Sequence, residues 1–220
     1  MSVVIVGAGP NLGLAVARRF GRDGMSVGLI ARDEQKLEEL STTLEGEGVT
    51  ADFDTADIRD SEALGTAIRG LADRLGPVEV LEYSPLPAKE FMKPILETSV
   101  EDLRGPLEFS VLGAAAAATA VVGPMIEAGS GSILFTTGGA AIKPYPLRAG
   151  VGVSFAAEVA YARMLHDELA DKGVHVGHTA IAGSIAPGGD HEPEEVAEVL
   201  WRHHAGRDGF QVLIGFEDRT

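Results

Sequence analysis

Cysteine is absent from the 220-residue chain, and aromatic residues make up only 5% of it. Without cysteine there are no disulfides and no thiolate chemistry, which is compatible with a reducing compartment. The length fits a single α/β domain with a core of ordinary size, so no second domain is expected.

Positive charge is also scarce. Lys and Arg total 18 against 33 Asp and Glu, which gives a net charge of −15. Nucleic acid and anionic membrane both favour basic surfaces, so neither is an expected partner. No uninterrupted apolar run reaches membrane-spanning length and no signal-peptide pattern opens the sequence, so we expect a cytoplasmic protein.

An early stretch, VVIVGAGPNLGL, joins an apolar run to a glycine-rich turn and a helical pattern. Gly7 suits a sharp exit from a strand, Gly9 lets a ligand approach the backbone, and Gly13 lets the new helix lie close to the sheet. The dipole and free N–H groups of such a helix attract a pyrophosphate, and Asn11 and Leu12 belong to the same turn. The alternative is a glycine-rich turn with a structural role only.

Strand-like and helix-like segments alternate along the rest of the chain. After a first helix to about residue 23, we expect strands near 26–31, 49–53, 78–83, 132–137, 175–182 and 211–214, helices near 34–44, 61–75, 106–128, 150–172 and 194–204, and a proline-rich loop over 84–99. Asp33 is the expected cap of the second helix, and either Asp60 or Ser61 is the expected cap of the third. Strands separated by crossover helices form a parallel sheet, so residues 1–220 are predicted to form one doubly wound, Rossmann-like α/β domain with helices on both faces.

The chain resembles the short-chain dehydrogenase/reductase family along almost its whole length. The resemblance rests on the order of elements, the glycine turn, the pair Asp57-Ile58 after the third strand, the long helices flanking the fifth strand, and the segment VHVGHTAIAGSI. It implies a dinucleotide-binding domain with Gly7, Gly13, Asp57 and Ile58 at the cofactor. It also implies hydride exchange with a small carbonyl or alcohol.

Two stretches depart from the family's pattern. Where its turn usually reads T-G-x-x-x-G-x-G, Val6 replaces the threonine and Asn11 the middle glycine. Asparagine tolerates positive φ better than most residues, so we expect the turn to survive. Where the family usually has N-N-A-G after the fourth strand, this chain reads YSPL, whose Tyr83 and Ser84 remain candidate cofactor contacts.

The family's catalytic positions hold residues of another kind. Its serine, tyrosine, lysine and asparagine fall on Gly138, Val151, Phe155 and Ser110. In the family's chemistry the tyrosine exchanges a proton with the reacting oxygen, but neither Val151 nor Phe155 has a titratable group. Loss of a positioned general acid typically slows a reaction by ~10²–10⁴. The resemblance therefore implies a divergent member that lacks the usual tetrad.

Other residues could supply the proton. Tyr145, with Lys143 close by to lower its pKa, lies in the loop after the fifth strand, where a substrate would sit. Thr137 could bond a substrate carbonyl, and Tyr83 could reach the nicotinamide pocket. The alternatives are structural: Lys143 as a solvated cation, Tyr145 packed against neighbouring prolines, and Thr137 as a strand cap.

Arg32 directly follows the second strand, where NAD-preferring folds place an acidic residue that binds the ribose 2′-OH. An arginine bonds a 2′-phosphate instead, so we expect NADP as cofactor, with NAD less favoured. Asp33 could weaken this preference, and the alternative is that Arg32 only covers the next helix.

The histidines do not predict a metal site. His191, His203 and His204 lie near the C-terminal helix, but adjacent helical histidines point in different directions and no HExxH-type pair is present. His178 lies within a strand and is expected to be a hydrogen-bonded core or cleft residue. We therefore expect no metal.

Three functions stay open at this point. The first is a divergent NADP(H)-dependent oxidoreductase with a non-standard proton donor. The second is a non-catalytic dinucleotide-binding sensor or regulatory subunit, and the third is a structural or interaction protein that has lost the cofactor. Gly7, Gly13, Arg32 and Asp57 argue against the third, while the altered tetrad favours the second over a standard form of the first.

Members of the resembled family commonly pair two long helices with those of a second copy. Here the alanine run over 114–118 and the apolar Val151, Val153, Phe155 and Val159 would supply such a surface. We therefore expect a homodimer or homotetramer.

Overall fold

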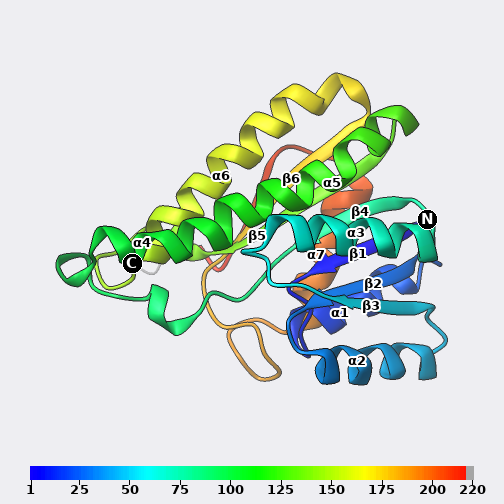
Figure 1. The fold of residues 1–220 in the computed structure, drawn as a ribbon, viewed down its shortest axis with the longest axis horizontal. Coiled ribbons are helices and arrows are strands. Elements are labelled where there is room, and N and C mark those ends of the chain that lie inside the picture. The colour runs from blue at the N-terminus through cyan, green and yellow to red at the C-terminus, as the bar shows by residue number, and fades with distance from the viewer. Residues whose placement is uncertain (217–220) are drawn as a thin grey trace.

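The computed structural model describes residues 1–216 and shows one seven-stranded sheet with helices on both faces (Figure 1). The strands are β1 (Ser2–Val6), β2 (Ser26–Ala31), β3 (Ala51–Thr55), β4 (Val78–Tyr83), β5 (Gly131–Gly138), β6 (Val174–Ile181) and β7 (Gln211–Ile214). Their order is β3-β2-β1-β4-β5-β6-β7, and each neighbouring pair is parallel. The predicted doubly wound α/β fold is confirmed.

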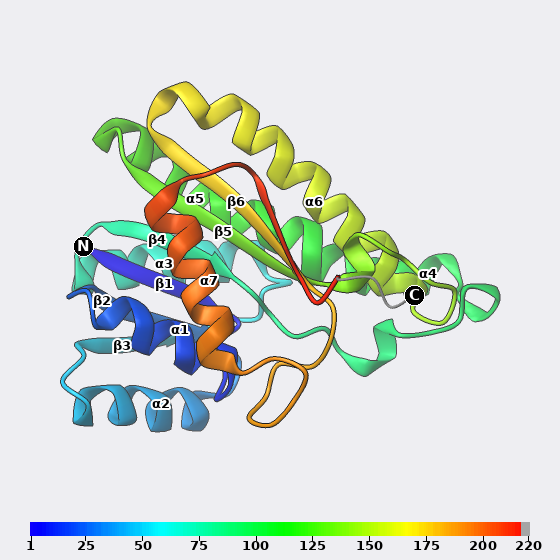
Figure 2. The same cartoon turned by 180° about the vertical axis from the view of Figure 1, so that it is seen from behind.

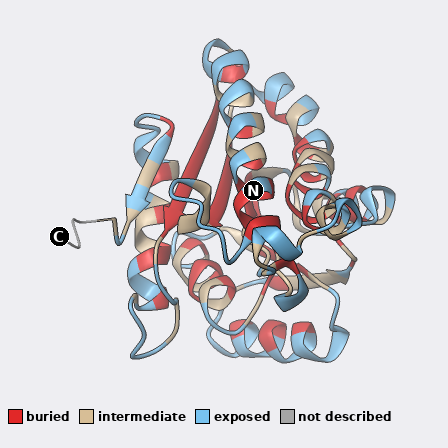
Figure 3. Cartoon of the chain, turned by 90° about the vertical axis from the view of Figure 1, so that its left-hand side faces the viewer, coloured by how far each residue is buried: buried red, intermediate tan, exposed pale blue. Residues whose placement is uncertain are grey.

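The helices form two layers around this sheet. They are α1 (Leu12–Gly21), α2 (Glu34–Gly46), α3 (Ser61–Leu75), α4 (Val100–Leu107), α5 (Gly113–Ala128), α6 (Ala149–Leu169) and α7 (Pro193–Gly206). One face packs against α3, α5 and α6, and the opposite face, seen in Figure 2, against α1, α2 and α7. Figure 3 shows the central strands buried between helices whose outer faces are exposed.

The order of the strands places the glycine turn at a switch point. The chain moves outward from β1 to β2 and β3 on one side, and then returns to add β4 on the other side. In doubly wound sheets a crevice opens where the strand order reverses, at the carboxyl ends of the strands. The turn after β1 and the loop after β4 therefore meet at one edge of the sheet.

The predicted helix caps are present. The Asp33 carboxylate accepts the Lys36 N–H at the start of α2, and the Asp60 carboxylate accepts the Ala63 N–H at the start of α3. Each bond satisfies an N–H that the helix itself leaves unpaired.

Two predicted boundaries were wrong. Strand β3 begins at Ala51 rather than near residue 49. Val49 instead packs so closely against Gly21 of α1 that a Cβ added to Gly21 would lie 2.6 Å from Val49 Cγ1. The helix expected from residue 106 begins at Val100. Ser99 Oγ accepts the Asp102 N–H while the Asp102 carboxylate accepts the Ser99 N–H, a capping box that the sequence analysis missed.

The helical run Val100–Ala128 comprises α4, a π-helical turn (Glu108–Leu112) and α5. By length and composition alone it could cross a membrane, which was not expected from the sequence; its most apolar 18-residue window has a mean hydropathy of 1.8. One face is nevertheless buried in the core through Ala117, Ala118 and Val121. A single helix of this kind is weak evidence for a membrane span, because core helices have the same length and composition.

The expected assembly surface is only partly on the outside. Val151 and Phe155 are each 4% exposed and belong to the core, so the prediction that they contribute to an interface was wrong. Val153 and Met164 of α6 and Ile126 of α5 are exposed. An interface through α5 and α6 stays a prediction.

A buried carboxyl lies on α6. Glu158 is 1% exposed, and its Oε1 has no hydrogen-bond partner within the described chain. Nearby, the Ser110 hydroxyl donates to Ser154 Oγ at 3.2 Å. Burial raises the pKa of Glu158 well above its ordinary value. Hydrogen bonding by the Ser110 side chain lowers the pKa, but by less than burial raises it. The folded protein therefore keeps this proton at pH values where an exposed glutamate has lost it.

Glu158→Gln is expected to stabilise the protein at alkaline pH only. The unfolded chain loses this proton near pH ~4.3, so the group's contribution to stability is complete below that pH and is lost as the pH rises toward its raised native pKa. Glutamine stays neutral, so we expect the free energy of unfolding to rise by about 1–3 kcal/mol at about pH 8 and to change little at about pH 4.5. Denaturant unfolding at both pH values measures this, and an equal change at both would contradict it.

Candidate functional site

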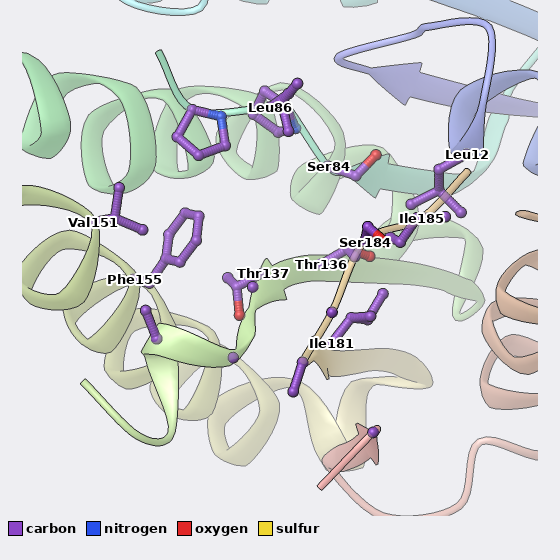
Figure 4. Close-up of a pocket in the computed structure, with 18 of the residues that line it drawn as sticks. Leu12, Ser84, Leu86, Thr136, Thr137, Val151, Phe155, Ile181, Ser184 and Ile185 are labelled. Carbon is purple, nitrogen blue, oxygen red and sulfur yellow. The ribbon is translucent and has the colours of Figure 1, made fainter. Parts of the chain in front are cut away.

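A cavity of about 1040 Å³ opens at the carboxyl ends of β1, β4, β5 and β6. It is lined by the segments 7–13, 84–87, 136–140 and 181–185, together with side chains from the start of α6 and the loop before it (Figure 4). The cavity brings together these residues that were singled out from the sequence: Gly7, Gly9, Asn11, Leu12, Gly13, Ser84, Thr137, Lys143 and Tyr145. Arg32, Asp57, Ile58 and Tyr83 do not line it.

Two positions of the turn after β1 require glycine: Gly7, whose backbone is left-handed, and Gly13, whose surroundings leave little room for a side chain. Gly7 has a φ of +94°, and a Cβ there would lie 2.6 Å from Pro85 N. A Cβ on Gly13 would lie 3.0 Å from Ala8 Cα, whereas Gly9 has no other described atom within 4 Å of that position. Gly9 thus leaves open space on the cavity side, where a ligand can approach the backbone.

Asn11 stabilises the turn through a side-chain hydrogen bond, and not through the backbone conformation that was expected. Its φ is −93°, so tolerance of positive φ was the wrong reason for an asparagine here. Its Nδ2 instead donates to the Ile185 carbonyl at 3.3 Å and ties the turn to the loop after β6. No described side chain caps α1, and the first turn of α1 has no acidic residue, so its N-terminus suits an anion.

Two arginines act on the Asp57 carboxyl, which does not line the cavity. Arg59 bonds the Asp57 carboxylate through its guanidinium at 2.8 Å and its backbone N–H at 3.0 Å. These contacts lower the pKa of Asp57, and the charge of the exposed Arg32 adds to the effect. Asp33 caps α2 and pairs with Lys36 at 2.7 Å, which neutralises the charge expected to oppose Arg32. Arg59 was not predicted from the sequence.

Tyr83 does not reach the cavity, so the prediction that it could contact the nicotinamide or donate a proton was wrong. Its side chain is fully buried, and its hydroxyl donates to the Phe109 carbonyl in the π-helical turn. Burial and the nearby Glu158 raise its pKa well above the ordinary value. Tyr83 therefore holds that turn against the sheet.

Thr137 is held by a histidine from the next strand. His178 Nε2 lies 2.8 Å from Thr137 Oγ1, and Gln211 Nε2 lies 3.0 Å from His178 Nδ1. Since the glutamine nitrogen only donates, Nδ1 accepts, and the ring proton sits on Nε2 and is donated to Thr137. Burial lowers the pKa of His178 to about 4, so the ring is neutral at neutral pH. His178 matches the expected hydrogen-bonded core residue.

Tyr145 and Lys143 both lie at the cavity mouth and are exposed. The cation that faces the Tyr145 ring is Arg148, whose Cζ lies 5.5 Å from the ring centroid. Arg148 also lines the cavity, and sequence reasoning did not identify it. The three side chains give the mouth a phenol and two positive charges.

The wall next to Thr137 is apolar. Val151 and Phe155 project from α6 beside Thr137 (Figure 4). A Cβ on Gly138 would lie 3.4 Å from Phe155 Cε2, so these three positions are neighbours in space. None of the three offers a proton.

The histidines near the C-terminal helix are used structurally. His191 Nε2 bonds the Ala182 carbonyl at 3.0 Å, and His204 Nδ1 lies 2.8 Å from Ser132 Oγ. Over residues 1–216, no group of three or more histidine or acidic side chains is placed to hold a metal ion.

The family model for short chain dehydrogenases matches residues 1–189. The chain belongs to the short-chain dehydrogenase family. This short-chain dehydrogenase is 30% identical over 212 residues to 2,3-dihydro-2,3-dihydroxybenzoate dehydrogenase of Bacillus subtilis, covering 96% of the chain and 76% of that protein. It is 26% identical over 204 residues to dehydrogenase/reductase SDR family member 4 of Bos taurus, covering 93% and 70%.

Solved structures share the fold of this short-chain dehydrogenase. One from Rhodopseudomonas palustris has a TM-score of 0.85 at 24% identity, covering 97% of both chains. L-sorbose reductase from Gluconobacter frateurii, solved with NADPH and L-sorbose, has a TM-score of 0.88 at 20% identity, covering 97% of this chain and 94% of that one. A polyketide ketoreductase solved with NADPH has a TM-score of 0.86 at 24% identity, covering 97% and 95%.

Proposed function

We propose that the chain is an NADP(H)-dependent oxidoreductase that interconverts a small carbonyl compound and its alcohol, with a proton donor other than the family's tyrosine. The observation that carries this is one cavity joining the glycine turn to Thr137 and Tyr145. Family membership supports the hydride chemistry. Similar reductases solved with NADPH support the choice of cofactor.

The residues present fit a dinucleotide. Open space at Gly9 and the uncapped N-terminus of α1 suit the pyrophosphate, and Arg32 suits a 2′-phosphate. Bound NADPH would supply a hydride to a carbonyl carbon. On the protein's side, Tyr145 donates the proton to the reacting oxygen, while Thr137, oriented by His178, forms part of the adjoining wall.

NADPH is expected to bind about 10–100 times more tightly than NADH, because charge-assisted bonds from an arginine to a 2′-phosphate contribute about 1.5–3 kcal/mol. Arg32→Ala should remove most of this preference while leaving NADH binding unchanged. Arg59→Ala, measured in the same way, shows whether the second arginine shares the role. Fluorescence titration gives the dissociation constants. Equal values for NADH and NADPH in the wild type would contradict the assignment of Arg32 to the 2′-phosphate.

A second function, a non-catalytic dinucleotide-binding sensor or regulatory subunit, is favoured by the apolar wall of Gly138, Val151 and Phe155. Titration with NADPH followed by a panel of small aldehydes and ketones separates the functions. Binding with turnover supports the oxidoreductase, and binding without turnover supports the sensor. Absence of binding would leave a structural or interaction role.

The proposal includes a cytoplasmic location and assembly as a homodimer or homotetramer through α5 and α6. The exposed Val153 and Met164 support such an interface. The net charge of −15 argues against nucleic acid as a partner.

A further inference from the structure

Glu82 is a fully buried carboxyl in the central strand β4. Its neighbours across the sheet are apolar, Ile5 on β1 and Leu134 on β5. Central strands of a parallel sheet are normally apolar throughout, because helices cover both faces. A carboxyl at this place therefore calls for a reason other than packing.

The carboxyl reaches the cavity through two hydroxyls. Ser84 Oγ donates to Glu82 Oε2 at 2.8 Å, and Thr136 Oγ1 donates to Glu82 Oε1 at 3.1 Å. Ser84 and Thr136 both line the cavity, on the side of the glycine turn and Leu12 (Figure 4). A ligand that bonds either hydroxyl would thus be linked to Glu82 through it.

The protonation state of Glu82 decides what the two hydroxyls can offer. Each hydroxyl has one proton, and the ionised carboxylate accepts both, so only oxygen lone pairs remain for a ligand. A protonated carboxyl donates one of the bonds itself, which frees one hydroxyl proton for the cavity. When Glu82 gains a proton, the cavity wall at Ser84 and Thr136 therefore changes from one that only accepts hydrogen bonds from a ligand to one that can donate a hydrogen bond.

We propose that Glu82 is a positioning residue for the dinucleotide: when Glu82 is protonated, one of the Ser84 and Thr136 hydroxyls is free to donate to the ligand, and when Glu82 is ionised, both hydroxyls donate to Glu82 instead. The inference rests on the proposed function, because the ligand addressed is the dinucleotide.

The surroundings place this switch near neutral pH. Burial raises the pKa of Glu82 to about 7, and its bonds from Ser84 and Thr136 oppose this only in part. On the helices packed against this face, Arg18 and Arg19 of α1 pair with Glu47 and Glu198, and Glu194 and Glu195 of α7 are exposed. The titratable histidines on α7 are His203 and His204; burial lowers the pKa of both, and His204 Nδ1 lies 2.8 Å from Ser132 Oγ on β5. Among residues 1–216, the charged residues that line the cavity are Lys143, Arg148 and Asp190, and Asp190 accepts from Ser184.

Dinucleotide binding is therefore expected to weaken by about tenfold between about pH 6 and pH 8, since one hydrogen bond to a charged ligand is lost and a buried negative charge appears. NADH and NADPH should show the same change, because the 2′-phosphate is proposed to lie at Arg32. This common change separates Glu82 from titration of the phosphate itself.

Glu82→Gln tests the switch, because the amide N–H₂ donates to a hydroxyl at every pH as the protonated carboxyl does. We expect this variant to bind both dinucleotides at about pH 8 as tightly as the wild type does at about pH 6, with a flat pH profile. Glu158→Gln is the matched control: it also removes a buried carboxyl, but one outside the cavity, and it should keep the wild-type profile. A wild-type profile in Glu82→Gln would overturn the proposal.

A second measurement stands apart from binding. Carbon-13 NMR of labelled glutamate carboxyls, assigned by comparison with Glu82→Gln, should show Glu82 titrating near pH 7. Ser84→Ala with Thr136→Val should raise that pKa further, since both hydroxyls stabilise the ionised form. If neither dinucleotide binds at any pH, the proposed function fails and this titration decides alone: a Glu82 that is ionised throughout, or insensitive to the two hydroxyls, rules the switch out.

Discussion

Gly7→Ala is expected to abolish dinucleotide binding and to lower the free energy of unfolding by about 3–5 kcal/mol. The φ of +94° at Gly7 lies in the left-handed region that a side chain avoids, and the new Cβ would meet the Pro85 backbone. Gly7 cannot simply move away, because its N–H donates to the Ile30 carbonyl at 2.9 Å. Thermal unfolding and NADPH titration measure the two effects.

Gly9→Ala is the matched control for this turn. Gly9 does not have a positive φ, and apart from Gly9 and its two chain neighbours no described residue has an atom within 4 Å of the added Cβ. We expect stability to change by no more than about 0.5 kcal/mol, while NADPH binding weakens because the methyl group projects into the space left for the ligand. If Gly9→Ala bound NADPH as tightly as the wild type, the pyrophosphate would not lie against this turn.

The fold was predictable because its signals are local. Apolar strands alternating with amphipathic helices lead to the parallel sheet, and the Asp33 and Asp60 caps follow from neighbouring residues. The early start of α4 was missed although its signal is also local: Ser99 and Asp102 stand at capping-box spacing within a segment whose prolines suggested a loop.

The site was predictable where a short stretch of sequence marks each part of it and the order of elements brings those parts together. The glycine turn and the loop holding Tyr145 do meet in one cavity, as the order of elements implies. The contacts of His178 depend instead on register between strands, which pairs it with Phe135 on β5 and Gln211 on β7. Tyr83 was misplaced because its side chain points into the core under α5 and not toward the strand ends.

Restoring the family's residues is expected to raise turnover by about 10²–10⁴, the usual contribution of a positioned general acid. The variant is Gly138→Ser with Val151→Tyr and Phe155→Lys, and all three positions line the cavity. The size-matched control carries Val151→Phe in place of Val151→Tyr, so it differs by a single hydroxyl. Thermal unfolding and NADPH binding show whether each variant is folded. This check is needed because Phe155 is buried, so a lysine in its place is tolerated only if its ammonium group reaches into the cavity and is not left in the apolar core.

Tyr145→Phe identifies the donor that the wild type uses. Wild-type turnover of small aldehydes and ketones with NADPH is expected to lie well below the typical ~10 s⁻¹ for enzymes. Because Tyr145 is proposed to protonate the reacting oxygen, its loss should lower the wild-type kcat by about 10²-fold and leave the NADPH dissociation constant unchanged. In the restored variant the same change should have little effect, since the new tyrosine at position 151 donates instead. Wild-type turnover that persists in Tyr145→Phe would leave water or the substrate itself as the proton source.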